Sequence, residues 1–118
     1  MVINDIRKAV YDACMATNVD TYDYWVVDIP FPYIVISDLS VDDTFYKLDT
    51  LQDVYIDIHV FTQDKGKTNA LTYVEQIKTQ LAALDAVGIR FSMRILNEKQ
   101  LGVTHGVLML QLKNYKGR

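Results

Sequence analysis

The sequence predicts an α+β domain: a mixed, mainly antiparallel sheet of four to five strands, with two helices packed on one face and an extended β-hairpin arm. Two segments repeat apolar residues at helical spacing, and four others are β-rich or alternate apolar and polar residues. Their order is helix, two strands, helix, two strands. A chain of 118 residues, half of them hydrophobic, has room for one core. We therefore expect a single domain over residues 1–118.

The first helix is predicted over Val2 to Thr17, where apolar residues recur at steps of three and four with charged residues on the other side. The next segment, Asn18 to Pro32, is polar and aromatic. It ends in Pro30-Phe31-Pro32, which disfavours a continuing helix. We expect a loop there with one short strand.

The first strand pair is predicted at Tyr33 to Leu39 and Val54 to Thr62. The second of these alternates strictly, so one face carries Val54, Ile56, Ile58 and Val60 and the other carries Tyr55, Asp57, His59 and Phe61. Between the strands, Ser40 to Gln52 is polar and acidic and lacks Gly and Pro. That composition favours a long hairpin arm whose strands extend past the core.

The second half repeats this pattern. A helix is predicted from Thr68, as N-cap, to Leu84, and Gly88 ends that region. A second hairpin is then predicted from Ile89 to Leu96 and Val103 to Leu112.

The net charge and the short length of the uncharged segments argue against binding to nucleic acid and against insertion into a membrane. The net charge is −3 and the pI is near 5.2, so no global positive field attracts nucleic acid or an anionic membrane. The uncharged runs fall short of the roughly 20 apolar residues that a membrane helix requires. Cys14 has no intrachain partner and the N-terminus does not resemble a signal peptide. We expect a soluble protein in a reduced compartment.

The charge is unevenly distributed along the chain. Residues 1–64 carry a net charge of −9 and residues 65–118 carry +6. If the two halves expose different faces, identical subunits can meet head to tail, and such a contact closes into a ring when the rotation permits.

Gly66-Lys67-Thr68 stands where a phosphate-binding loop would stand, between a strand and a helix. The full motif needs a glycine five residues before Gly66, and that position is Phe61. We therefore predict no nucleotide site. Lys65 and Lys67 are instead predicted to form an exposed basic turn for an acidic partner.

No cofactor, metal or catalytic group is predicted. His59, His105 and Cys14 share no local ligand spacing, and half-buried strand histidines are the favoured interpretation, although a site that joins all three stays open. Cys14 lies in the apolar stripe of the first helix, where we expect a buried, inert thiol. The Asp42-Asp43 pair has no catalytic spacing, and Asp is common in loops for its backbone hydrogen bonds.

Aromatic residues mark a candidate interface. Phe45 and Tyr46 fall in the middle of the predicted arm, among acidic residues, and Trp25 belongs to an aromatic segment before the first long strand. Large aromatics on a projecting element need a surface that buries them. We expect them to contact another subunit.

Three segments taken in order resemble one family: FPYIVISDLS, VYIDIHVFTQDKGKTNALTYVEQIKTQL and THGVLMLQL. The corresponding positions are Pro32 to Val35, Ile56 to Phe61, Lys65 to Lys67 with the helix to Leu84, and His105-Gly106. Their order and spacing resemble the tail-terminator, or tail-completion, proteins of long-tailed bacteriophages and prophages.

The resemblance implies a structural virion protein and no enzyme. It implies a ring of six subunits that caps the tail tube, ends its polymerisation and joins the tail to the head connector. The partners would be further copies of the chain, the tail-tube protein and the head-tail connector, and the location the head-tail junction after synthesis in the bacterial cytoplasm. Residues expected at the subunit or tube interface are Trp25, Phe45, Tyr46, Lys65 and Lys67.

Two other classes stay open at this stage. One is a head-closure or connector protein of the same virion. The other is a small dimeric α+β ligand-binding domain or enzyme, which would need a concave apolar pocket with convergent polar groups.

Overall fold

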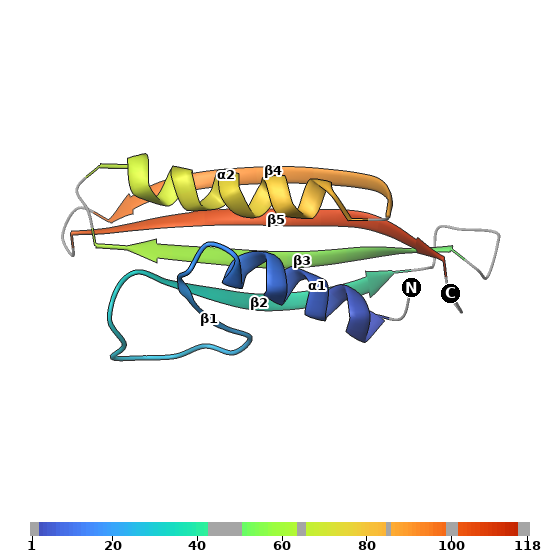
Figure 1. The fold of residues 1–118 in the computed structure, drawn as a ribbon, viewed down its shortest axis with the longest axis horizontal. Helices are drawn as coiled ribbons and strands as arrows, with labels where there is room; N and C mark the ends of the chain where they lie inside the picture. The colour runs from blue at the N-terminus through green and yellow to red at the C-terminus, as the bar shows by residue number, and fades with distance from the viewer. Residues whose placement is uncertain (1–2, 43–50, 64–65, 85, 99–101, 116–118) are drawn as a thin grey trace.

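The computed structural model describes residues 3–42, 51–63, 66–84, 86–98 and 102–115. They form two helices and five strands (Figure 1). In chain order the elements are α1 (Ile3–Met15), β1 (Asp20–Tyr22), β2 (Tyr33–Asp42), β3 (Leu51–Thr62), α2 (Thr68–Ala82), β4 (Val87–Glu98) and β5 (Val103–Tyr115). The predicted α+β class, with two helices and a sheet of up to five strands, is confirmed.

The strands form one mixed sheet in the order β1-β2-β3-β5-β4. β1 runs parallel to β2, and every other neighbouring pair is antiparallel. The strands of the N-terminal half therefore make one side of the sheet, and those of the C-terminal half make the other. The sequence pattern predicted the strands, but this order is new information.

Both helices cover the same face of the sheet, as predicted (Figure 1). The residues at helical spacing and the alternate strand residues meet there, which removes their apolar surface from water. α1 contributes Ile6, Val10, Ala13 and Cys14, and α2 contributes Ala70, Val74, Ile77 and Leu81. The sheet contributes Ile34, Ile36, Val54, Ile56, Ile58, Val60, Leu108, Leu110 and Leu112.

Gly106 allows α2 to lie close against β5. A Cβ built at Gly106 would stand 3.0 Å from Cγ2 of Val74 and 3.2 Å from Cδ1 of Ile95. Such distances leave no room for a methyl group without movement of these neighbours. The glycine is thus a packing requirement of the helix-covered face.

The predicted start and end of the second helix need correction. The N-cap is Lys67, whose carbonyl accepts the first helical hydrogen bond from the N–H of Leu71, so Thr68 is already helical. Among the described side chains, none caps this end. The helix ends at Ala82, and Gly88 lies inside β4, where its φ of +64° falls in a register shift against β5. Glycine reaches that conformation without the cost of a Cβ.

The predicted hairpin arm lies only partly within the described residues. β2 and β3 run further than their apolar segments, and they remain paired out to Asp42 opposite Asp53. β2 also carries an irregular step between Ile36 and Leu39. Phe45 and Tyr46 fall in residues 43–50, outside the described part of the chain.

Neither helix among the described residues reaches the combination of length and apolarity that a membrane crossing requires.

Candidate interface on the open face of the sheet

The face of the sheet opposite the helices, called the open face below, has a different composition. Residues that alternate with the buried ones in β3 and β5 point toward it and are mostly partly exposed. Aromatic and imidazole rings occupy one end, and polar and charged groups follow along the strands. From the strand register, the side chains of this face in β3 and β5 are Asp53, Tyr55, Asp57, His59, Phe61, His105, Val107, Met109, Gln111 and Lys113.

Five rings gather at one end of the open face and form what we call the aromatic-histidine cluster: Trp25, Tyr33, His59, Phe61 and His105. The register places Tyr33 opposite Phe61 and Phe61 opposite His105. The Phe61 and His105 rings stack at 4.3 Å between centroids, and Tyr33 stacks on Phe61 at 4.8 Å. Trp25, from the loop before β2, lies 5.0 Å from His59 and remains 59% exposed.

Hydrogen bonds join the two histidines to each other and to β2. Nδ1 of His59 lies 2.7 Å from Nε2 of His105, and Nε2 of His59 lies 2.9 Å from the hydroxyl oxygen of Ser37. In a neutral pair, one imidazole donates its N–H and the other accepts. The chain of three side chains thus ties β2, β3 and β5 together across the open face.

The surroundings of the pair favour its neutral form. Burial lowers the pKa of His59 below its usual value, and the negative charges of Asp57 and Asp38 partly oppose this shift. Burial also lowers the pKa of His105; the neighbouring His59 lowers it further, and Glu98 opposes the shift. Both effects follow from the cost of a charge in a partly desolvated site.

Cys14 does not join the histidines. It is fully buried in the core between α1 and the helix-covered face of the sheet, whereas the imidazoles lie on the open face. The predicted burial of Cys14 is confirmed, and this burial raises the pKa of its thiol to about 12, which disfavours the reactive thiolate. Within the described residues, no cluster of three His, Cys, Asp or Glu side chains has the arrangement of a metal site.

Lys67 is exposed at the start of α2, in the turn that follows β3. The carbonyl of Gly66 beside it accepts a hydrogen bond of 3.1 Å from the hydroxyl of Thr104, which fixes this turn to β5. Phe61, at the position where the full phosphate-binding motif would need a glycine, is a strand residue of the aromatic-histidine cluster. Lys65 lies outside the described residues.

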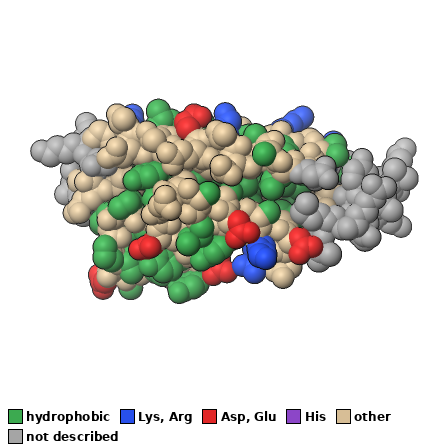
Figure 2. All heavy atoms as spheres, in the orientation of Figure 1, with side chains coloured by type: hydrophobic (Ala, Val, Ile, Leu, Met, Phe, Trp, Pro, Cys, Tyr) green, Lys and Arg blue, Asp and Glu red, His purple; other side chains and the backbone are tan. Residues whose placement is uncertain are grey.

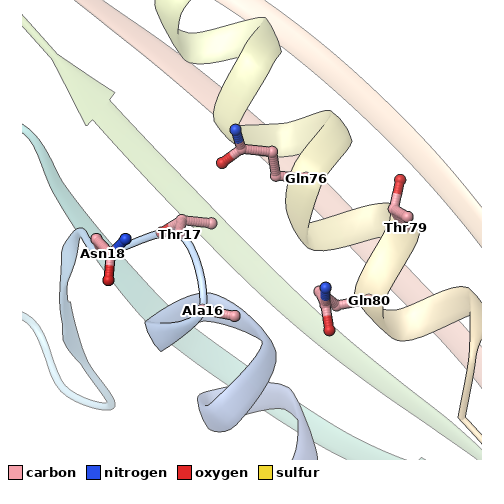
Figure 3. A pocket seen from close by; sticks show the side chains of 6 residues that line it. All are labelled: Ala16, Thr17, Asn18, Gln76, Thr79 and Gln80. Atoms are coloured by element: carbon pink, nitrogen blue, oxygen red, sulfur yellow. The ribbon is translucent and has the colours of Figure 1, made fainter.

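Two of the surface cavities formed by the described residues are large enough for a small molecule. One, of about 350 Å³, lies between the C-terminal end of α1 and α2 (Figure 3). None of its lining residues is ionisable: they are Ala16, Thr17, Asn18, Gln76, Thr79 and Gln80. The other, of about 340 Å³, lies on the open face beside Asp57 and Arg90. In the second lining, the strand register places Met109 between Ser92 and Asp57, so this hydroxyl and this carboxylate are not adjacent as covalent catalysis would need.

The two sides of the molecule carry opposite charge. The described residues up to 63, which include α1, β1, β2 and β3, hold nine Asp and two basic side chains, whereas the described residues from 66 to 115, which include α2, β4 and β5, hold five basic side chains and two Glu. Figure 2 shows acidic side chains mostly over the α1 and β2 side and Lys and Arg mostly over the α2 side. The sheet order keeps the halves apart, so the sequence asymmetry becomes an asymmetry in space.

The aromatic-histidine cluster was missed by the sequence analysis. Alternation had already placed His59 and Phe61 on one face of their strand, opposite the apolar side chains. What was missing was the pairing of β3 with β5, which brings His105 next to them. The sequence does hold one signal: an antiparallel alignment of these two predicted strands can place His105 opposite Phe61, and testing such alignments would have found the cluster.

Solved structures define the class of this fold. Over 92% of each chain, the protein matches a chain in the virion of a native gene transfer agent particle, with a TM-score of 0.71 and 18% identity. It also matches the bacteriophage SPP1 gp17 protein with a TM-score of 0.58 and 21% identity, over 98% of this chain and 92% of that one. The comparison with curated protein sequences gives no significant match.

The family model described as "Tail completion protein gp17" matches residues 8–111, nearly the whole chain. The chain belongs to this family of tail completion proteins. It is therefore a structural protein of a phage tail, and its family is not known for an enzymatic activity. The predicted tail-completion family is confirmed.

Proposed function

We propose that this protein assembles into a ring, of six subunits, that caps the finished tail tube, ends its polymerisation and joins the tail to the head connector. Its partners are further copies of the chain, the tail-tube protein and the connector. The protein is made in the cytoplasm of the host bacterium and then occupies the head-tail junction. The family membership supports the tail-completion part of this role.

One observation carries the ring. The acidic and basic halves of the chain lie on opposite sides of one sheet, so the basic side of a subunit can meet the acidic side of the next. When two identical subunits meet through two different surfaces, each still has one unused surface that can bind a further subunit. Addition of subunits therefore stops only when the chain of subunits closes into a ring. Complementary potentials speed such encounters and disfavour like-to-like contacts.

The proposed contacts to neighbouring subunits or to the tube are Trp25, Phe45, Tyr46, Lys65 and Lys67. Among these, Trp25 and Lys67 lie in the described residues, and both are exposed. Trp25 can bury its exposed ring surface against a partner, as aromatic anchors do at protein interfaces. Lys67 presents its charge at one end of the sheet, where an acidic surface can approach it.

The test is the mass of the assembled species, measured by mass photometry over a concentration series, alone and with tail tubes that lack their cap. We expect a closed species of six subunits, and negative-stain images should show rings, free or at one end of each tube. Addition of the protein to growing tubes should stop their elongation. A stable dimer at every concentration, or tubes that elongate unchanged, would contradict the proposal.

Reversal of both charges in Lys65→Glu/Lys67→Glu should weaken attachment to the tube or head by about tenfold, because two attractive contacts become repulsive. The variant should unfold at the same urea concentration as the wild type, since surface charges contribute little to stability. Lys8→Glu, on the exposed side of α1, is the matched control. Normal tail joining by the double variant would remove the lysines from the interface.

A further inference from the structure

The two edges of the sheet differ in how much of them is covered: β4 forms one edge, and β2, partly covered by β1, forms the other. Within the described residues, β4 pairs only with β5, so all twelve residues from Val87 to Glu98 present one unpaired backbone side. At the opposite edge, β1 covers only Tyr33 to Val35 of β2. The later part of β2 carries no further described strand. Long unpaired strand edges favour pairing with another chain unless a protein blocks them.

At each edge, side chains point alternately to the open face and to the helix-covered face. The side chains of the two edges are complementary: opposite charges on the open face and apolar groups on the helix-covered face. On β4, Arg90 and Arg94 point to the open face, while Phe91 and Met93 point to the helix-covered face and are partly exposed. Lys78 of α2 lies over the Phe91 ring, 5.8 Å from its centroid, and extends the basic side.

On the later part of β2 the open-face charges are negative instead of positive, and the helix-covered face again carries apolar side chains. Leu39 and Val41 pair with residues of the helix-covered face and yet remain 40% and 44% exposed. Asp42 points to the open face, and Asp38, exposed in the irregular step, acts through its charge on His59 of that face. An apolar strip beside an acidic strip thus faces outward at this edge.

Strand direction fits a contact between subunits. β2 and β5 run one way and β3 and β4 the other, because each neighbouring pair among them is antiparallel. When a second copy is placed beside the first by rotation about an axis along the strands, its β2 lies antiparallel to β4 of the first. The alternation then continues across the boundary without interruption.

We propose that the β4 edge from Arg90 to Arg94 pairs with the later part of β2 of a second copy of this chain, in an antiparallel register set by the side chains. The pairing ends there, because the residues after Ile95 would reach the part of β2 that β1 covers. With Ser92 opposite Ser40, Arg90 meets Asp42 and Arg94 meets Asp38 on the open face. In the same register, Phe91 lies beside Val41 and Met93 beside Leu39 on the helix-covered face. Backbone hydrogen bonds supply affinity, and the matched side chains select the partner.

The charges argue for a second copy as the occupant. The spacing of four residues between Arg90 and Arg94 equals that between Asp38 and Asp42, so a single register satisfies both pairs and both apolar contacts. The inference rests on the proposed ring and identifies the surfaces that close it. Each subunit uses one edge of each kind, which is the head-to-tail arrangement that a ring requires.

Charge exchange tests the register. Asp38→Arg and Arg94→Asp should each lower ring assembly by at least about tenfold, because one opposite-charge pair becomes a like-charge pair in every contact. Mixing the two variants in equal amounts should restore rings, since the introduced arginine of one variant then meets the introduced aspartate of the other around an alternating ring. Asp12→Arg on the exposed side of α1 is the matched control, and unchanged urea unfolding shows that each variant is folded.

Disulfide trapping tests the same contact without a change of charge. Residues directly opposite in an antiparallel pair lie within reach of a disulfide. Ser40→Cys/Ser92→Cys should therefore give a ladder of covalent oligomers on oxidation of the assembled protein. The control Ser40→Cys/Thr72→Cys, with its second cysteine on the exposed side of α2, should not. Native Cys14 is buried and stays out of the reaction.

The outcomes separate this inference from the proposed function. Rings that form normally with Asp38→Arg, and that give no ladder with the paired cysteines, would overturn the edge pairing and leave the ring standing. A covalent product that stops at the dimer would overturn the head-to-tail form. Wild-type protein that forms no ring, either alone or on tail tubes, would overturn the proposed function and the edge pairing together.

Discussion

The two faces of the sheet have different roles. The helix-covered face is made of Ile, Leu and Val side chains that are almost fully buried against α1 and α2. The open face carries rings, carboxylates and guanidinium groups, most of them partly exposed. Hydrophobic burial on the first face supplies the stability of the domain. Most side chains of the second face remain partly exposed, so substitutions there outside the aromatic-histidine cluster should affect folding little.

This contrast separates stability from assembly in the same strand. In β3, consecutive side chains point to opposite faces, so neighbours in sequence serve different ends. Substitution of a fully buried residue on the helix-covered face should remove assembly only by unfolding the subunit. A substitution on the open face or at an edge should change assembly while the subunit stays folded.

The largest expected effect comes from Ile58→Ala. Ile58 is fully buried under the helices, and its truncation should lower the free energy of unfolding by about 2 to 5 kcal/mol. Asp57→Ala, one residue earlier but on the open face, should change it by no more than about 0.5 kcal/mol. Urea unfolding followed by circular dichroism measures both. Equal losses would show that the open face also holds the fold together.

Gly106→Ala should cost about 1 to 3 kcal/mol of unfolding free energy, because the new methyl group would meet Val74 and Ile95 under α2. Gly66→Ala is the matched control. A Cβ at Gly66 has no atom within 4 Å, and its backbone is not in the left-handed region, so the change should be neutral or slightly stabilising. The comparison uses the same measurement, and a neutral Gly106→Ala would contradict the close packing of α2 on β5.

The histidine pair should make stability depend on pH. Because burial lowers the pKa of His59 and His105 below 6.5, the unfolded chain binds protons that the folded chain does not. Their contribution is complete above pH 6.5 and is lost as the pH falls through the lowered values. The urea midpoint should therefore decrease from pH 7.5 to pH 5, with up to about two protons taken up on unfolding. In His59→Gln/His105→Gln this decrease should be smaller; an identical pH profile would exclude the pair as its source.

Trp25→Ala should have the smallest effect on stability and a clear effect on assembly. The indole is 59% exposed, so the free energy of unfolding should fall by at most about 1 kcal/mol. Assembly on the tail tube should weaken by at least about tenfold if the indole anchors a partner. Tyr24→Ala, next in the chain and 62% exposed, is the control for the loss of an exposed aromatic ring. Equal assembly by both variants would argue against a specific role for Trp25.

Much of the fold could be predicted from local pattern. The alternation of Val54 to Thr62 identified β3 and both of its faces, and the helical spacing identified α1 to within two residues at either end. The errors fell at boundaries: Thr68 was expected to cap α2, and Gly88 was expected to end that region. Boundaries depend on which backbone groups find partners, and tertiary contacts such as the bond from Thr104 to Gly66 influence that choice.

The candidate interface could be predicted only in part. Trp25 and Lys67 are exposed, as an interface requires, while Phe45, Tyr46 and Lys65 lie outside the described residues. The link between His59 and His105 joins residues 46 positions apart. A local sequence pattern cannot predict a contact over that separation, because strand pairing is decided by contacts across the whole sheet.

Local pattern was sufficient for the class of the fold, the elements, the buried face of each long strand and the uneven charge of the two halves. These features follow from periodicity and composition, which act over a few residues at a time. The order β1-β2-β3-β5-β4 emerged only in the folded chain, and with it came the histidine pair, the separation of charge across the sheet and the two uncovered edges. Strand order depends on distant segments that compete for the same backbone partners, so it exists only once the chain has folded.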